Sequence, residues 1–182
     1  MTPMTLRADC ARCAALCCVA FAFDRSELFA IDKPVGVRCP HLKGGAQCAI
    51  HAEREAQGFG GCVGYDCRGA GQRVVQDLFG GASWEDEPDL LGPMLQAFAV
   101  ASRAHELLML LDGASKLDLS RAERRRLRGL KKALNEMADN ARIGVWSNAV
   151  AADVHEFLQS LRRHAPSVRA LERALPRAGL CK

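Results

Sequence analysis

The chemistry of this sequence is concentrated in its cysteines. The chain has 182 residues and nine cysteines, and eight of the nine lie within the first 67 residues. These eight are Cys10, Cys13, Cys17, Cys18, Cys39, Cys48, Cys62 and Cys67, whereas Cys181 stands apart. Thiols clustered in this way form either a disulfide framework or a set of metal ligands.

Two observations favour metal ligation over disulfides and over merely buried thiols. The segment before Cys10 has no apolar stretch behind a basic head, so we expect no secretory signal and a cytoplasmic, reducing location. Disulfides do not persist in such a compartment. The two-residue gap between Cys10 and Cys13 also lets both sulfurs turn toward one ion.

The number of thiols predicts more than one centre. Zinc takes four ligands, and a [4Fe–4S] cluster is also held by four cysteines. If Cys17 and Cys18 lie in an extended segment, their side chains point to opposite sides and do not readily chelate one ion. Two four-cysteine centres are the simplest count, and one centre with spare thiols is the alternative.

Thiolate ligands are compatible with zinc, copper(I) or iron–sulfur clusters, and the sequence does not decide between them. Each bond needs a deprotonated thiol, and metal-binding free energy becomes folding free energy. Residues 10–67 contain many turn signals and few large apolar residues. We therefore expect this segment to need its metal in order to fold.

The order of the cysteines resembles a known family. Cys10-x2-Cys13-x3-Cys17-Cys18 precedes Cys39-Pro40-His41-Leu42, Cys48-Ala49-Ile50-His51 and two late cysteines. This is similar to the CxxCxxCC (YkgJ-type) family, a zinc- or iron-chelating domain, over about residues 8–70. The gap before the cysteine pair is three residues here and two in the family. The resemblance implies that all eight cysteines are ligands of zinc or of an iron–sulfur cluster, with [4Fe–4S] the expected type.

Two further resemblances concern function and layout. Related cysteine clusters are linked to iron–sulfur centres in flagellin lysine-methylating enzymes, although no methyltransferase motif is visible here. The layout, with Gly-Ala-Gly-Gln-Arg-Val at 69–74 and Leu-Pro-Arg-Ala-Gly-Leu at 175–180, resembles the N-terminal region of actinobacterial pentapeptide-repeat proteins. Because no repeats occur, the resemblance implies a stand-alone relative or a truncated form.

Other candidate groups near the cysteines have weaker signals. His41 and His51 could ligate zinc, but we favour a hydrogen bond to a cysteine sulfur or a surface position. Glycines around Cys62 and Cys67 could bring backbone N–H groups to sulfur, or simply form turns. Asp66 could position a proton donor, but a surface salt bridge is the simpler expectation. The glycines at 69 and 71 lack the spacing of a nucleotide site.

The second part of the chain predicts helices. Leucines and other apolar residues recur at helical spacing over 88–111, starting near Pro88 and ending at Asp112-Gly113. Ser120-x-x-Glu123 is a capping box for a second helix. A third helix is expected from Asn148 or Asp153 to His164, and a short fourth from Pro166 to Leu175. Strand signals are almost absent, with Val35–Val37 and Val74-Val75 too short to matter.

These patterns predict a mostly α chain in two parts. Residues 1–80 form an irregular cysteine-rich metal-binding module, which packs on a small helical bundle formed by residues 81–182, with Trp146 and Phe98 buried. No apolar run approaches the roughly 18 residues of a membrane span.

Charge says little about partners. The net charge is +4, from 25 basic and 21 acidic residues, and the chain is 49% hydrophobic, as in ordinary globular proteins. Basic residues crowd positions 121–132 and could bind nucleic acid, but acidic residues lie nearby and stacking aromatics are absent, so we favour a solvated helix face.

The predicted function is metal binding through one or two thiolate-ligated centres, with iron–sulfur favoured over zinc. The protein would be a structural, redox-sensing or regulatory module with a protein partner. The alternative is an iron–sulfur-dependent enzyme that modifies a protein or peptide. A catalytic centre keeps an open ligand position, whereas eight thiolates over two centres leave none, which favours the non-catalytic function.

Overall fold

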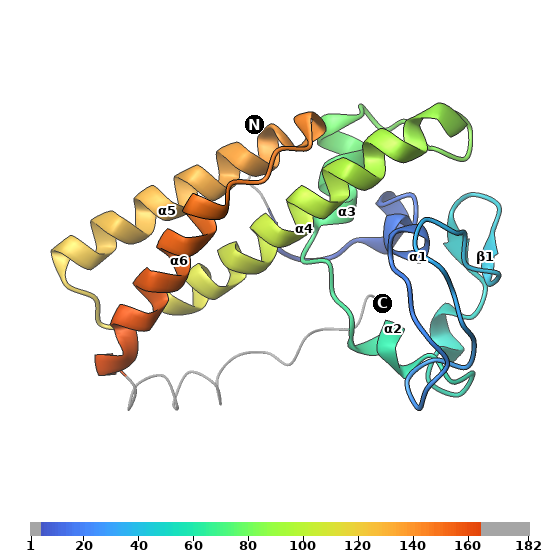
Figure 1. The fold of residues 1–182 in the computed structure, drawn as a ribbon, viewed down its shortest axis with the longest axis horizontal. Coiled ribbons are helices and arrows are strands. Elements are labelled where there is room, and N and C mark those ends of the chain that lie inside the picture. The colour runs from blue at the N-terminus through green and yellow to red at the C-terminus, as the bar shows by residue number, and fades with distance from the viewer. Residues whose placement is uncertain (1–4, 165–182) are drawn as a thin grey trace.

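Three long helices form one end of the molecule. The structure is a computed structural model, and it describes residues 5–164. The long helices are α4 (Leu91–Ala114), α5 (Arg121–Asp139) and α6 (Asn148–Ser160). Figure 1 shows them side by side, with the cysteine-bearing loops gathered at the opposite end of α4. The predicted mostly α fold is confirmed.

The helix starts follow from local capping. The Ser120 hydroxyl accepts a hydrogen bond from the Glu123 N–H, and the Glu123 carboxylate accepts one from the Ser120 N–H, which confirms the predicted capping box. The Ser147 hydroxyl caps α6 by accepting from the Val150 N–H, and α6 begins at Asn148. Pro88 opens a 3₁₀ turn (Pro88–Leu90) that leads into α4.

Helix α4 runs one residue past its predicted end. The expected stop at Asp112-Gly113 lies inside the helix, which continues to Ala114. Ala114 is itself buried, and its contact with the bundle core extends the helix past the glycine.

The bundle has an aliphatic core with one central aromatic ring. Leu134 of α5 and Val154 of α6 are fully buried, and Phe157 is only 1% exposed. α4 packs against both α5 and α6, and α5 packs against α6. Trp146 is partly buried at this core, whereas Phe98 lies in a second cluster nearer the cysteines.

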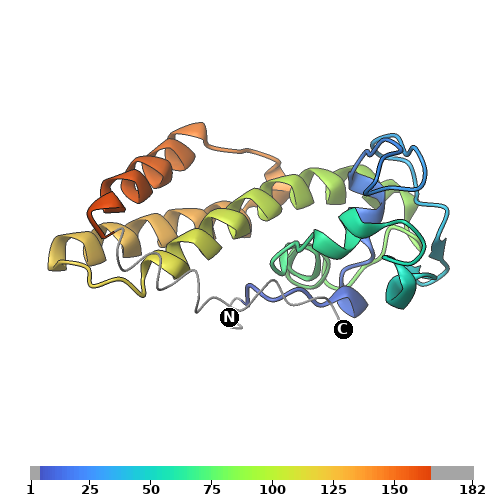
Figure 2. The same ribbon diagram turned by 90° about the horizontal axis from the view of Figure 1, so that it is seen from below.

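The cysteine-bearing part contains only short elements. They are the helices α1 (Leu16–Ala20), α2 (Gly60–Gly64) and α3 (Ala70–Gln72), a π-helical turn (Arg73–Leu78), and 3₁₀ turns at Cys10–Arg12 and His51–Glu53. Strands β1 (Leu42–Lys43) and β2 (Gln47–Cys48) pair antiparallel, with Leu42 opposite Cys48. The remaining 3₁₀ turns, Ala141–Ile143 and Leu161–His164, follow α5 and α6. In Figure 2 the short elements crowd around one end of α4.

Two local expectations are corrected here. Cys17 and Cys18 lie in helix α1, so the premise that they sit in an extended segment is wrong. Val74 and Val75, considered as weak strand signals, lie in the π-helical turn, where both are buried. Burial of α1 and of this turn against α4 outweighs the β propensity of valine.

The two parts of the chain share one apolar cluster. Leu16 and Val19 of α1 are buried together with Met94, Phe98 and Ala101 of α4. The division at residues 80/81 therefore separates segments that pack against each other, and it stays a prediction as a domain boundary.

Some predictions concern parts of the chain that the structure does not describe. The fourth helix at 166–175, the segment 175–180 and Cys181 all lie outside residues 5–164. Across the described range, no helix is both long and apolar enough to cross a membrane.

Gly71 provides a test of the packing of α3 on the first cysteine turn. A Cβ added at Gly71 would lie 2.7 Å from the Cys13 Cβ, whereas one added at Gly129 of α5 would meet nothing within 4 Å. We expect Gly71→Ala to lower the free energy of unfolding by about 1–3 kcal/mol because the core is overpacked. The matched control Gly129→Ala should raise it by about 0.5–1 kcal/mol. Denaturant unfolding followed by circular dichroism measures both, and equal effects would contradict this packing.

Candidate metal centre

All eight clustered cysteines line a single cavity. The cavity has a volume of about 530 Å³. Its wall includes these cysteines: Cys10, Cys13, Cys17, Cys18, Cys39, Cys48, Cys62 and Cys67. They come from the 3₁₀ turn at residues 10–12, from α1, β2 and α2, and from the loops between them. Residues as far apart in sequence as Cys10 and Cys67 thus meet at one place.

The rest of the wall is largely aromatic and aliphatic. Phe21, Phe23, Phe29, Phe59 and Ile50 contribute to it. Phe23 stacks on Phe29 with ring centroids 4.2 Å apart, and Phe59 meets Phe23 edge-on. An apolar wall lowers the local dielectric, so charges placed in the cavity interact more strongly than they would in water.

Main-chain N–H groups hydrogen-bond four of the sulfurs. In each case a donor is the residue two positions after the cysteine: Ala15 for Cys13, His41 for Cys39, Ile50 for Cys48 and Gly69 for Cys67. The Gly71 N–H also donates to Cys67. These bonds favour the thiolate form. The expectation that glycines near Cys67 bring N–H groups to its sulfur is therefore met at both glycines.

The turns that make these bonds contain unusual backbone conformations. Ala14, Ala15, Ala46 and Arg68 have positive φ values between 45° and 54°. A left-handed conformation costs a non-glycine residue roughly 1–2 kcal/mol. These residues all lie within two positions of a cysteine, so the strained backbone occurs where the sulfurs are positioned.

We group the eight thiols into two sets by their electrostatic interactions, although some of these interactions also link the two sets. Cys62 interacts with Cys18, Cys39 and Cys48, and Cys39 interacts with Cys18 and Cys48. We call Cys18, Cys39, Cys48 and Cys62 the lysine-side set, because the ammonium group of Lys33 acts on Cys18 and Cys39.

The other four thiols form the second set. Cys17 interacts with Cys13 and Cys67, and Cys67 interacts with Cys10. We call Cys10, Cys13, Cys17 and Cys67 the tyrosine-side set, because Tyr65 interacts with Cys17 and Cys67. The sets are in contact at the adjacent pair in α1, where the Sγ atoms of Cys17 and Cys18 are 4.0 Å apart. Cys13 also interacts with Cys18, and Cys10 interacts with Cys48.

The thiol pKa values reflect burial first. Burial raises the pKa of Cys62 to about 11 and also raises the pKa of Cys39, Cys48 and Cys67. The hydrogen bond between the neighbours in α1 raises the pKa of Cys17 and lowers that of Cys18. A cation entering the cavity must therefore displace protons from most of these thiols.

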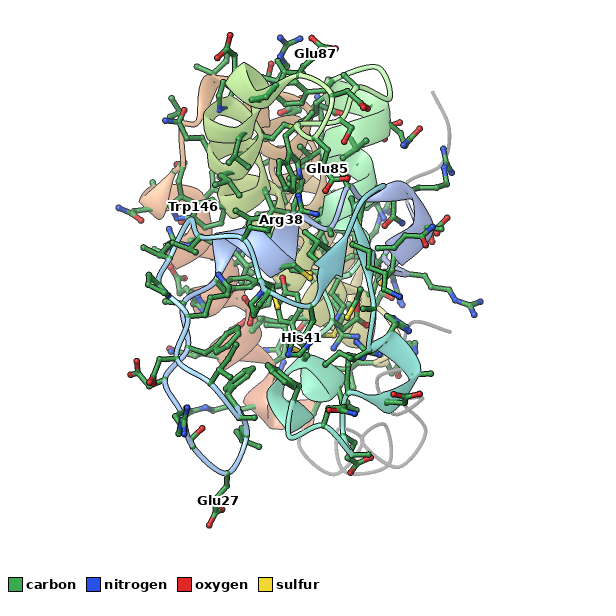
Figure 3. All side chains as sticks on the ribbon, turned by 90° about the vertical axis from the view of Figure 1, so that its right-hand side faces the viewer. Glu27, Arg38, His41, Glu85, Glu87 and Trp146 are labelled. Carbon is green, nitrogen blue, oxygen red and sulfur yellow. The ribbon has the colours of Figure 1, made fainter. Side chains whose placement is uncertain are left out.

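A segment after the π-helical turn holds the cysteine loops in place. The Trp84 indole N–H donates to the Ala14 carbonyl at 2.7 Å, between Cys13 and Cys17. The Glu85 carboxylate accepts from the Ala46 N–H at 2.6 Å and forms a 2.9 Å salt bridge with Arg38. Figure 3 shows Arg38 and Glu85 beside each other, above His41 and the yellow sulfur atoms.

The histidines considered from the sequence both reach the cavity. His41 lines it and packs edge-on against Phe59, with ring centroids 4.9 Å apart. His51 also lines it, and its Nε2 atom is buried with no hydrogen-bond partner among residues 5–164. Burial lowers the pKa of His51. His51 is thus partly buried, with its Nε2 atom inside, and hydrogen bonding to a sulfur stays a prediction.

The salt bridge expected for Asp66 is confirmed. Asp66 forms a 3.0 Å salt bridge with Arg68. Its neighbour Tyr65 lines the cavity, and burial raises the pKa of this phenol well above its usual value.

Two cations near the thiols were not predicted from the sequence. Lys33 is only 3% exposed. Arg54 donates from Nε to the His51 carbonyl and from a terminal nitrogen to the Cys62 carbonyl. Both act on Cys18 and lower its pKa. A lysine before a proline in a turn carries no signal for burial, so only the tertiary structure identifies Lys33.

Within residues 5–164, no three His, Cys, Asp or Glu side chains are grouped tightly enough to hold one ion. A tetrahedral zinc site with bonds near 2.3 Å needs four sulfurs only about 3.8 Å apart. An iron–sulfur cluster places each thiolate on a different iron, so its ligands stand wider apart. The cavity has eight thiols and room for such a group.

None of Cys13, Cys17, Cys18, Cys39, Cys48, Cys62 and Cys67 forms a disulfide.

Comparison with known proteins finds one relative in a bacterium. The chain is 39% identical over 116 residues to a Bacillus subtilis (strain 168) protein described as uncharacterized protein YybG. The match covers 64% of this chain and 42% of the relative, so the chain spans less than half the relative's length. No family model matches the chain, and no solved structure matches it significantly. The chain is thus similar to part of a longer bacterial protein whose description states no activity.

Proposed function

We propose that the cavity holds one or two thiolate-ligated metal centres, with iron–sulfur favoured over zinc. The observation that carries the proposal is that eight cysteines, scattered over 58 positions from Cys10 to Cys67, line one cavity. Structural thiols of a hydrophobic core have no reason to converge in this way. The module would act in structure, redox sensing or regulation, together with a protein partner.

Three features of the wall support a thiolate site. The N–H donors at residues 15, 41, 50 and 69 stabilise negative charge on sulfur. Lys33 and Arg54 add positive charge beside the lysine-side set. Nε2 of His51 is buried at the cavity wall without a hydrogen-bond partner among residues 5–164, and in the Nε2–H tautomer it would add a further donor. Hydrogen bonds to cluster sulfurs and ligand sulfurs tune the potential of iron–sulfur centres.

The division of the thiols supports two centres. Each set contains four cysteines, which is the number that a zinc ion or a [4Fe–4S] cluster requires. Cys17 and Cys18 fall in different sets, although they are neighbours in a helix and not in an extended strand. One centre with spare thiols is the competing arrangement.

The enzyme alternative rests on the size of the cavity and on its aromatic wall. Its volume lies in the range of small-ligand pockets. Tyr65 could donate a proton to a group bound there. In this alternative an iron–sulfur centre acts on a protein or peptide, and it needs a ligand position that is not filled by cysteine.

The basic helix supports a solvated face more than a nucleic-acid site. On α5, Arg126 pairs with Glu156 at 3.1 Å, Lys132 pairs with Glu136, and Lys131 pairs with Asp112. These carboxylates offset part of the positive charge that a phosphate backbone would require. We therefore propose that the partner is another protein and not a nucleic acid. The proposed location stays cytoplasmic.

Anaerobic purification tests the proposal directly. We expect iron and sulfide in the purified protein, with a broad charge-transfer absorbance near roughly 400 nm from thiolate-bound iron. A colourless protein with zinc at one or two ions per chain would make the module structural. A protein that contains neither metal after anaerobic purification would contradict the proposal.

Serine substitutions at the α1 pair test the number of centres. With two centres, Cys17→Ser and Cys18→Ser should each remove about half of the bound metal, since each set loses one of four ligands. Cys181→Ser is the control, because this cysteine lies outside the cluster, and it should keep the full metal content. If both α1 variants destroy one and the same centre equally, the two-centre count is wrong.

A further inference from the structure

The buried ammonium group of Lys33 forms no salt bridge with an acidic side chain of residues 5–164. Its side chain is 3% exposed, and Nζ donates to the carbonyls of Val19 (3.2 Å), Pro34 (3.1 Å) and Val37 (2.8 Å). The ring of Phe23 lies 5.6 Å from Nζ. Burying an unpaired charge is costly, so a negative counter-charge is to be expected nearby.

The groups within range of Lys33 that can become negative are thiols. Those that act on it are Cys39, Cys18, Cys17 and Cys62, three of which belong to the lysine-side set. Burial lowers the pKa of Lys33, whereas negative charge on these sulfurs raises it, and a bound metal would supply that charge by displacing the thiol protons. Arg54, the other cation close to this set, is held by carbonyls of residues 51 and 62. On the tyrosine-side set, the carboxylate of Asp66 acts on Cys67.

Lys33 also joins the two chain segments that carry its thiol neighbours. Val19 directly follows Cys18, and Val37 lies two residues before Cys39. The Cys39 N–H donates to the Cys18 carbonyl at 3.1 Å, so the two cysteines are already linked through the main chain. Lys33 does not line the cavity, which places its charge behind the wall and out of contact with a bound group.

We propose that Lys33 is a fixed positive counter-charge for a metal centre held by Cys18, Cys39, Cys48 and Cys62. Of the two centres, this one would then be the more easily reduced, or the one that holds its metal more tightly. The inference rests on the proposed metal-binding function. Lys33 would act through its electric field, which favours negative charge on the thiolate-ligated centre. Its hydrogen bonds would keep that charge in place.

The experiment compares variants that separate charge from hydrogen bonding. Lys33→Gln keeps an N–H donor without the charge, Lys33→Arg keeps the charge, and Lys43→Gln removes a charge from an exposed position on β1. The anaerobically purified full chain is challenged with a chelator, and metal release is followed together with the reduction potential if iron is present. We expect Lys33→Gln to lose metal from one centre about tenfold more readily and to lower its potential by about 59 mV. Lys33→Arg and Lys43→Gln should behave like the wild type.

The outcomes are distinguishable. Unchanged metal release and potential in Lys33→Gln would overturn the inference while leaving the metal site intact. Equal losses in Lys33→Gln and Lys33→Arg would assign Lys33 a purely structural role, and a lowered melting temperature without a change in potential would do the same. A wild-type protein without metal would instead refute the proposed function, and this inference with it.

Discussion

The cysteine loops depend on α4 for their apolar support. They contain only two-residue strands and helices of a turn or so, and such elements cannot bury enough surface to be stable alone. Leu16 and Val19 of α1 are buried against Met94 and Phe98 of α4. This contact fixes α1, and α1 carries the two adjacent cysteines at which the two thiol sets meet. The geometry of the cavity therefore depends on one contact between α1 in the first part of the chain and α4 in the second.

On this support, polar contacts complete the cavity. Trp84 and Glu85 follow the cysteine-rich segment in sequence but bond back to Ala14, Arg38 and Ala46. Gln72 does the same nearer the N-terminus, since it accepts from the Asp9 N–H and donates to the Arg7 carbonyl. Residues after Cys67 thus tie down loops that precede it. A bound metal would add bonds of the same kind, between segments that have little other reason to meet.

The sequence predicted the three long helices of the described chain and the cysteines that come together. The Ser120-x-x-Glu123 pattern predicted the capping box, and helical periodicity predicted the bounds of α4 to α6 to within a few residues. The eight cysteines proposed as ligands from the sequence all line the cavity, together with aromatic and aliphatic residues that were not predicted. Local patterns failed for α1 and for the π-helical turn, because their conformations depend on burial against α4. Local patterns also failed to predict that Lys33 is buried. Its burial depends on the carbonyls of residues 19, 34 and 37, which only the folded chain brings together around Nζ.

The N–H···S bonds have a consequence for how this sequence can diverge. At His41 and Ile50 the sulfur is held by the main chain, so every amino acid except proline can provide the same donor. Ala15 and Gly69 are more restricted, because both have positive φ and β-branched residues rarely adopt that conformation. Relatives could thus keep this cavity while sharing little beyond their cysteines and a few small residues, and a search that weighs all positions equally would miss them.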